Sequence, residues 1–71
     1  MAKYKIPDSV YQERDKAIVL SLVDYYTQMN GYIDLEKINP TTLSTKFGIN
    51  PERAKKALKV LIAEGKVVKV G

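Results

Sequence analysis

Two Asn-Pro pairs, Asn39–Pro40 and Asn50–Pro51, constrain the fold of this chain more than any other feature. An Asn side chain caps a helix N-terminus, and Pro fits the first helical position because the N–H that it lacks has no partner there. Each pair therefore predicts the start of a helix. Gly48 lies between the pairs and predicts a stop, because glycine adopts the left-handed conformation of a tight turn. The sequence thus predicts helices over residues 40–47 and 51–64, joined by a short turn.

Upstream of these pairs, the sequence predicts one long helix from Val10 to about Met29. Asp8 and Ser9 are good N-cap residues, and Asn30–Gly31 is a strong helix stop. Apolar residues cover more than one face of this helix. Such a helix is expected either to lie at the centre of the core or to pair with a second copy of itself.

Two short segments are predicted to be strands. Residues 32–35 alternate in polarity, and residues 66–70 form a terminal strand that would pair with them. The expected order is helix, strand, helix, helix, strand, a mainly α fold with a small β component. We expect a single domain over residues 1–71, in which residues 1–8 are a lead-in arm.

Composition excludes several classes of function. The chain has 71 residues and neither cysteine nor histidine, so it is expected to have no disulfide, no Cys/His zinc site, no thiol nucleophile and no histidine acid–base group. We therefore expect no enzyme activity, no cofactor and no metal. The longest apolar run is interrupted at Ser21, far short of a membrane span, and no secretory leader is evident. A cytoplasmic location is expected, in the nucleoid or in the cytoplasm of a host cell.

The charge is unevenly distributed along the chain. Residues 41–71 carry seven Lys or Arg against two Asp or Glu, whereas residues 1–40 carry five against six. The net charge of +4 therefore arises in the C-terminal half. A basic half is typical of a polyanion partner, most often a nucleic acid, although a solubilising lysine surface would look the same.

Residues 38–70 resemble the helix-turn-helix core of winged-helix proteins. The resemblance rests on Leu43-Ser44-x-x-Phe47-Gly48-Ile49-Asn50 and on Ala54-x-x-x-Leu58-x-x-Leu61. It implies a winged helix-turn-helix over residues 40–64 that binds double-stranded DNA and regulates transcription. Because only one strand is predicted after Gly65, the wing is expected to be abbreviated, similar to compact regulators of archaeal plasmids and viruses.

The same stretch is similar to the winged-helix small-subunit ribosomal protein family numbered twenty-five. This similarity rests on Ile38-x-Pro40-x-x-Leu43-Ser44 and Ala54-Lys55-Lys56-Ala57-Leu58-Lys59. It implies ribosomal RNA as an alternative partner. The chain lacks the family's long lysine-rich N-terminal tail, which favours the DNA-binding alternative. A protein–protein winged-helix module is the third alternative.

The expected DNA contacts follow from the outward face of the helix over residues 51–64. Glu52, Arg53 and Lys56 are candidate base contacts, since Arg forks onto guanine and Glu accepts from cytosine. Candidate phosphate contacts come from both helices and, with the cap residue Asn50, complete the predicted DNA-binding set: Thr41, Thr45, Lys46, Lys55 and Lys59.

We also expect a homodimer built on the first long helix, because two copies would double the contacts on a palindromic DNA site. Tyrosine and aliphatic residues form adjacent stripes along this helix. The predicted dimer interface consists of Ile18, Leu22, Tyr25 and Tyr26.

Overall fold

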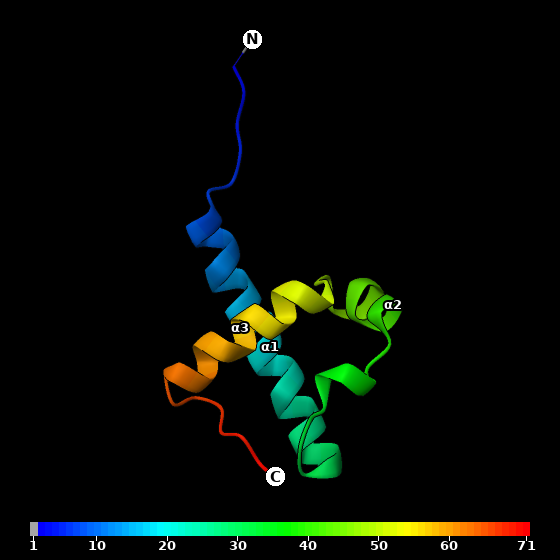
Figure 1. The fold of residues 1–71 in the computed structure, drawn as a ribbon. Coiled ribbons are helices and arrows are strands. Elements are labelled where there is room, and N and C mark those ends of the chain that lie inside the picture. Colours follow the sequence, from blue (N-terminus) through cyan, green and yellow to red (C-terminus); the bar gives the residue numbers. More distant parts are fainter. Residues whose placement is uncertain (1) are drawn as a thin grey trace.

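Helices and turns make up all the regular structure of residues 2–71. The computed structural model describes residues 2–71. In chain order the elements are α1 (Asp8–Asn30), the 3-10 turn η1 (Leu35–Lys37), α2 (Pro40–Thr42), the π-helical turn η2 (Leu43–Phe47) and α3 (Pro51–Ala63). The axis of α3 crosses the middle of α1, while η1, α2 and η2 loop out to one side (Figure 1).

Both Asn-Pro pairs begin helices as predicted. Asn39 Oδ1 accepts a hydrogen bond from the backbone N–H of Thr41, and Asn50 Oδ1 accepts one from that of Arg53, each at 2.8 Å. These caps satisfy N–H groups that the first helical turn leaves without partners. Local chemistry therefore sets where α2 and α3 begin.

Gly48 lies in the left-handed region, with φ of 67°, and ends the helical segment that α2 and η2 form together. The last turn of this segment is wider than an α-helix, since the N–H of Gly48 donates to the carbonyl of Leu43, five residues before it. The predicted helix over residues 40–47 is thus confirmed as one helical segment, and its second half has π geometry.

The long first helix is also confirmed, and it ends at Gly31 with φ of 86°. Its start differs from the prediction. No side chain caps α1: Pro7 occupies the N-cap position in extended conformation, and its carbonyl accepts from Val10 N–H at 3.0 Å. Asp8 instead lies in the first turn, where its negative carboxylate interacts favourably with the positive end of the helix dipole.

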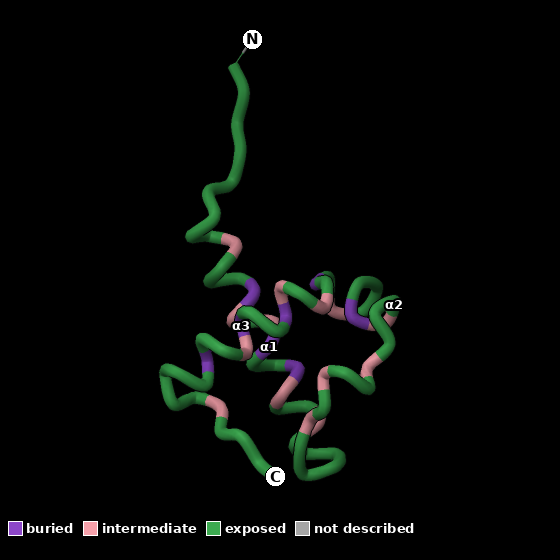
Figure 2. The backbone as a smooth tube through the Cα atoms, viewed as in Figure 1, coloured by how far each residue is buried: buried purple, intermediate pink, exposed green. Residues whose placement is uncertain are grey.

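The core is small and centred on the crossing of α1 and α3 (Figure 2). Ala54 and Ala57 face α1 at the crossing, and small side chains there allow the two helices to pack closely. Ile49 is buried in the corner between η2 and α3. The buried apolar set is Val19, Leu22, Leu43, Ile49, Ala54, Ala57 and Leu61.

The predicted strands are wrong, and with them the winged-helix architecture. Residues 2–71 contain no strand. Asp34 Oδ1 accepts a hydrogen bond from Glu36 N–H at 3.1 Å, which folds residues 35–37 into a 3-10 turn instead of an extended chain. Without a partner strand, residues 66–70 gain no ladder of hydrogen bonds and remain irregular. The expected mixed fold with an abbreviated wing is therefore replaced by a helical one.

Candidate nucleic-acid interface

The turn between η2 and α3 fixes the direction of α3 relative to η2. Gly48 supplies the left-handed residue, Ile49 is buried beside it, and Asn50 caps α3. Because Ala54, Ala57 and Leu61 are buried, the opposite side of α3 faces solvent. The sequence thus folds into two helical segments joined by a short turn, with one outer face of α3 free.

That outer face carries three of the predicted contacts. Glu52, Lys56 and Lys59 are all exposed, and at 100° per residue they lie opposite the buried alanines of α3. None of the ion pairs among residues 2–71 involves these three side chains. The two ammonium groups are therefore available to an anionic partner.

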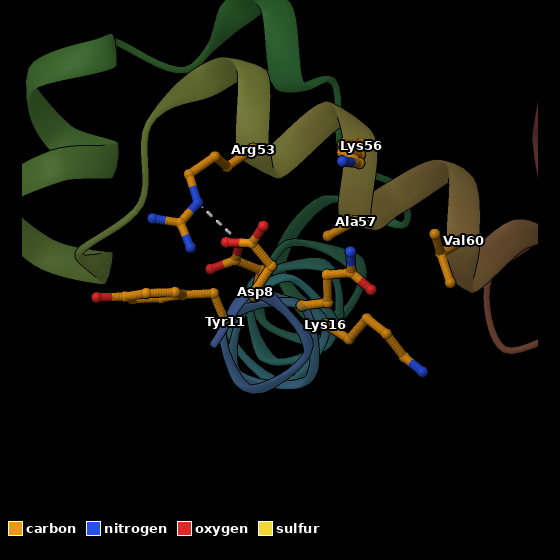
Figure 3. A pocket seen from close by; sticks show the side chains of 9 residues that line it. Asp8, Tyr11, Lys16, Arg53, Lys56, Ala57 and Val60 are labelled. Atoms are coloured by element: carbon orange, nitrogen blue, oxygen red, sulfur yellow. Dashed lines mark hydrogen bonds and ion pairs between the residues drawn. The ribbon is translucent and has the colours of Figure 1, made fainter. Parts of the chain in front are cut away.

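Arg53, a predicted base contact, also makes contacts within the chain. Its Nε–H donates to Oδ2 of Asp15 at 2.9 Å, and its guanidinium lies 4.8 Å from the centre of the Tyr11 ring (Figure 3). The Asp15 side chain is only 11% exposed, whereas the Arg53 side chain is 39% exposed. Arg53 as a base contact stays a prediction, and within the chain the Nε–H of this side chain holds α3 to α1.

A second ion pair ties the other end of α3 to α1. Lys16 Nζ donates to Glu64 Oε2 at 2.9 Å and also lies 3.5 Å from Glu13 Oε1. The hydrogen bond between them raises the pKa of Lys16 above its ordinary 10.5 and lowers the pKa of Glu64 below its ordinary 4.5. Neighbouring residues of α1, Asp15 and Lys16, thus hold both ends of α3.

Between these two ties lies a cleft of about 680 Å³, which α1 and α3 line together. Tyr11 and Gln12 form the α1 side, and Lys56 and Val60 the α3 side. Figure 3 looks into this cleft, with α3 passing above α1. Lys56 therefore lies at the edge between the cleft and the outer face of α3.

The remaining predicted phosphate contacts divide by environment. Thr41, Thr45 and Lys46 are exposed on α2 and η2, although the Thr45 hydroxyl donates to the carbonyl of Thr41 at 2.8 Å. Lys55 is exposed but lies 3.9 Å from Glu36 of η1. Asn50 is occupied as a helix cap through its carbonyl oxygen, and its amide nitrogen has no partner among the hydrogen bonds of the described chain.

Arg14 is a candidate contact that the sequence prediction missed. Its terminal nitrogen lies 3.5 Å from the position that a Cβ on Gly48 would occupy, so it reaches from α1 to the turn before α3. No ion pair in residues 2–71 neutralises it. No local sequence signal could place it there, because 34 residues separate it from the turn.

The predicted dimer interface is only partly exposed. Leu22 is completely buried in the chain's own core and has no surface for a partner, so this residue is corrected to a core position. Ile18 and Tyr26 are half-buried against the same core. Tyr25 is 54% exposed and packs edge-to-face on Tyr26, with ring centres 5.3 Å apart. The apolar excess of α1 is therefore used only in part within the chain, since Leu20 and Met29 are exposed as well as Tyr25.

No known protein family, curated protein or solved structure matches this chain. Within residues 2–71, no group of three acidic, histidine or cysteine side chains is placed to hold a metal ion. In the same part of the chain, each helix is too short or too polar for a membrane span.

Proposed function

We propose that this protein binds double-stranded DNA and acts as a transcriptional regulator, with the outer face of α3 in the major groove. The observation that carries the proposal is the pair Lys56 and Lys59, exposed and free of ion pairs on the face of α3 opposite the core. An α-helix fits the major groove, and unpaired cations on its outer face would meet bases or phosphates.

Surrounding groups support the same orientation. Lys46 on η2 and Arg14 beside the Gly48 turn add cations near the first turn of α3. Glu52 would accept a hydrogen bond from cytosine, and Lys56 would donate to guanine. With Arg53 held by Asp15, these two side chains remain as the base contacts of the proposal.

The location follows from the partner: a regulator that binds DNA works inside the cell, in the cytoplasm, the nucleoid or the cytoplasm of a host.

We also propose a homodimer on a palindromic site, with Tyr25 as its centre because that side chain is the most exposed of the four predicted interface residues. Two copies would present two α3 helices to successive major grooves.

The test compares labelled duplex DNA with a structured RNA of equal charge at one salt concentration, by fluorescence anisotropy. We expect the duplex to bind more tightly and its affinity to fall steeply with salt, as phosphate contacts require. Preference for the RNA would favour the ribosomal alternative. Binding to neither would contradict the proposal and favour a protein partner.

The matched variants are Lys56→Ala with Lys59→Ala, and Lys69→Ala as a control in the exposed C-terminal segment. The double variant is expected to lose at least tenfold in duplex affinity, and the control to bind like the wild type. Equal losses in both would mean that binding depends on total charge and not on the face of α3.

A further inference from the structure

The segment before α1 extends away from the rest of the molecule. Residues 2–7 are exposed, and Tyr4 is 92% exposed. None of the side-chain hydrogen bonds or ion pairs of the described chain involves residues 2–6. Figure 1 shows this segment, here called the arm (residues 2–7), continuing beyond the first turn of α1. Packing within residues 8–71 therefore does not explain the sequence of the arm.

The arm has a regular pattern. Lys3 and Lys5 alternate with Tyr4 and Ile6, and in an extended chain alternate side chains point to opposite sides. The two ammonium groups therefore share one side of the arm. The nearest acidic residue along the chain, Asp8, lies beyond Pro7 in the first turn of α1.

The arm begins close to the proposed DNA surface. Asp8 and Tyr11, at the start of α1, line the same cleft as Lys56 of α3. Pro7 holds the exit from α1 in extended conformation, with φ of −70° and ψ of 155°. A duplex that lies against Lys56 would therefore also lie close to Asp8, where the arm joins α1.

We propose that the arm is a second DNA contact, which lies in the minor groove next to the major groove occupied by α3, with Lys3 and Lys5 as its contacts. This inference rests on the proposed DNA-binding function. The reach is sufficient, since six extended residues span up to roughly 20 Å at about 3.3–3.6 Å each. Neighbouring major and minor grooves lie on the order of 17 Å apart, half of a helical turn of about 34 Å.

The same chemistry specifies the kind of DNA. A·T runs have a narrow minor groove with an enhanced negative potential, which attracts inserted cations. An arm with two lysines and no acidic residue of its own is suited to that potential. We therefore expect A·T base pairs to be preferred beside the segment that α3 occupies.

The experiment compares wild type, the double variant Lys3→Ala with Lys5→Ala, and Lys69→Ala as a matched lysine control. Each is titrated against two duplexes that share a central sequence and differ only in A·T or G·C flanks. Since the arm makes no contact with the core, all three proteins are expected to melt at the same temperature. Anisotropy then gives affinity, flank preference and salt dependence.

The expected result is that wild type and the Lys69 control prefer A·T flanks severalfold and that the arm variant loses this preference. Its plot of log affinity against log salt should also become shallower by up to about 2, at roughly 0.9 per phosphate contact. A ligand specific for the A·T minor groove should compete with wild type and leave the arm variant's affinity nearly unchanged.

The two proposals fail differently. If wild type binds duplex DNA and weakens with Lys56→Ala, but the arm variant keeps the wild-type affinity and flank preference, the arm inference is overturned alone. If wild type binds neither duplex, the arm inference and the proposed function are both wrong.

Discussion

Arg53 and Asp15 form a hydrogen-bonded ion pair of 2.9 Å that joins the first turn of α3 to the buried side of α1. The Tyr11 ring, one helical turn before Asp15, stacks beneath the guanidinium. This arrangement satisfies the one buried charged side chain among the described residues. An arginine in the most basic part of the chain is thus part of the structural framework.

The first prediction is that Arg53→Ala lowers stability. It leaves the Asp15 carboxylate without its partner, and we expect a loss of about 1–3 kcal/mol, less than for a fully buried pair because the Arg53 side chain is 39% exposed. Urea unfolding measures this loss. Lys56→Ala is the matched control, and it should leave stability within about 0.5 kcal/mol of the wild type. Equal stability of both variants would show that the ion pair contributes nothing to the fold.

The second prediction concerns Gly48, whose φ is 67°. A Cβ there would meet only Arg14, at an ordinary contact distance of 3.5 Å, so the cost of substitution arises from the backbone and not from a clash. Gly48→Val should destabilise by about 1–3 kcal/mol, and Gly48→Asn by less, because Asn tolerates the left-handed conformation. Thermal melting gives the order Gly, Asn, Val. Equal melting of the Val and Asn variants would contradict a left-handed turn.

The third prediction is a pH dependence that arises from Lys16 and Glu64. Because the folded pKa of Glu64 is lowered, its stabilising effect is present above the ordinary value of 4.5 and is lost as the pH falls through the folded pKa. Because the folded pKa of Lys16 is raised, its contribution is present below 10.5 and is lost as the pH rises through the folded pKa. Glu64→Gln should flatten the acid limb of melting temperature against pH, and the exposed Glu52→Gln should not. An unchanged acid limb in Glu64→Gln would mean that this pair does not couple folding to protons.

The fourth prediction separates two lysines on the outer face of α3. Lys56→Ala should relax sequence preference, at a cost of about 1–3 kcal/mol on the preferred sequence, since it is a proposed base contact. Lys59→Ala should weaken binding to all sequences similarly and reduce the salt slope, as a phosphate contact does. Selection from a random duplex library with each variant measures the difference. Identical effects of both variants would mean that α3 makes no base contacts.

The fifth prediction tests the homodimer. Sedimentation equilibrium at tens of micromolar should give twice the chain mass of 8.0 kDa. Tyr25→Glu should give the single-chain mass without loss of helicity, because this side chain is mostly exposed. Leu22→Glu is expected to unfold the chain instead, since that residue is fully buried. A wild-type mass near 8.0 kDa would rule out the dimer.

The parts of the fold that could be predicted are those that local chemistry controls. The Asn39 and Asn50 caps and the glycine stops involve residues within a few positions of one another. A short stretch of sequence is therefore enough to predict them. The presence of strands could not be predicted from short segments alone. Residues 66–70 have an apolar composition that favours a strand, but a strand also needs a partner strand. The expected partner, residues 32–35, does not form one, because the Asp34 side chain bonds to Glu36 N–H and begins a 3-10 turn.

The same distinction applies to the candidate interface. The exposure of Lys56 and Lys59 follows from helical periodicity, and it is observed. The positions of Arg53 and Arg14 depend on α1, which is remote in sequence, and periodicity on α3 alone cannot distinguish an outward arginine from one that bends back to a buried carboxylate.

The pairing of Asp15 with Arg53 also has a consequence for the chain as it is synthesised. The two residues are 38 positions apart, and a ribosome adding about 5–20 residues per second needs roughly 2–8 s to cover that distance. During this interval α1 has no α3 to cover Val19 and Leu22, and an isolated helix is only marginally stable in water. Val19 and Leu22 can therefore be buried against α3 only after residues 53–61 have been added.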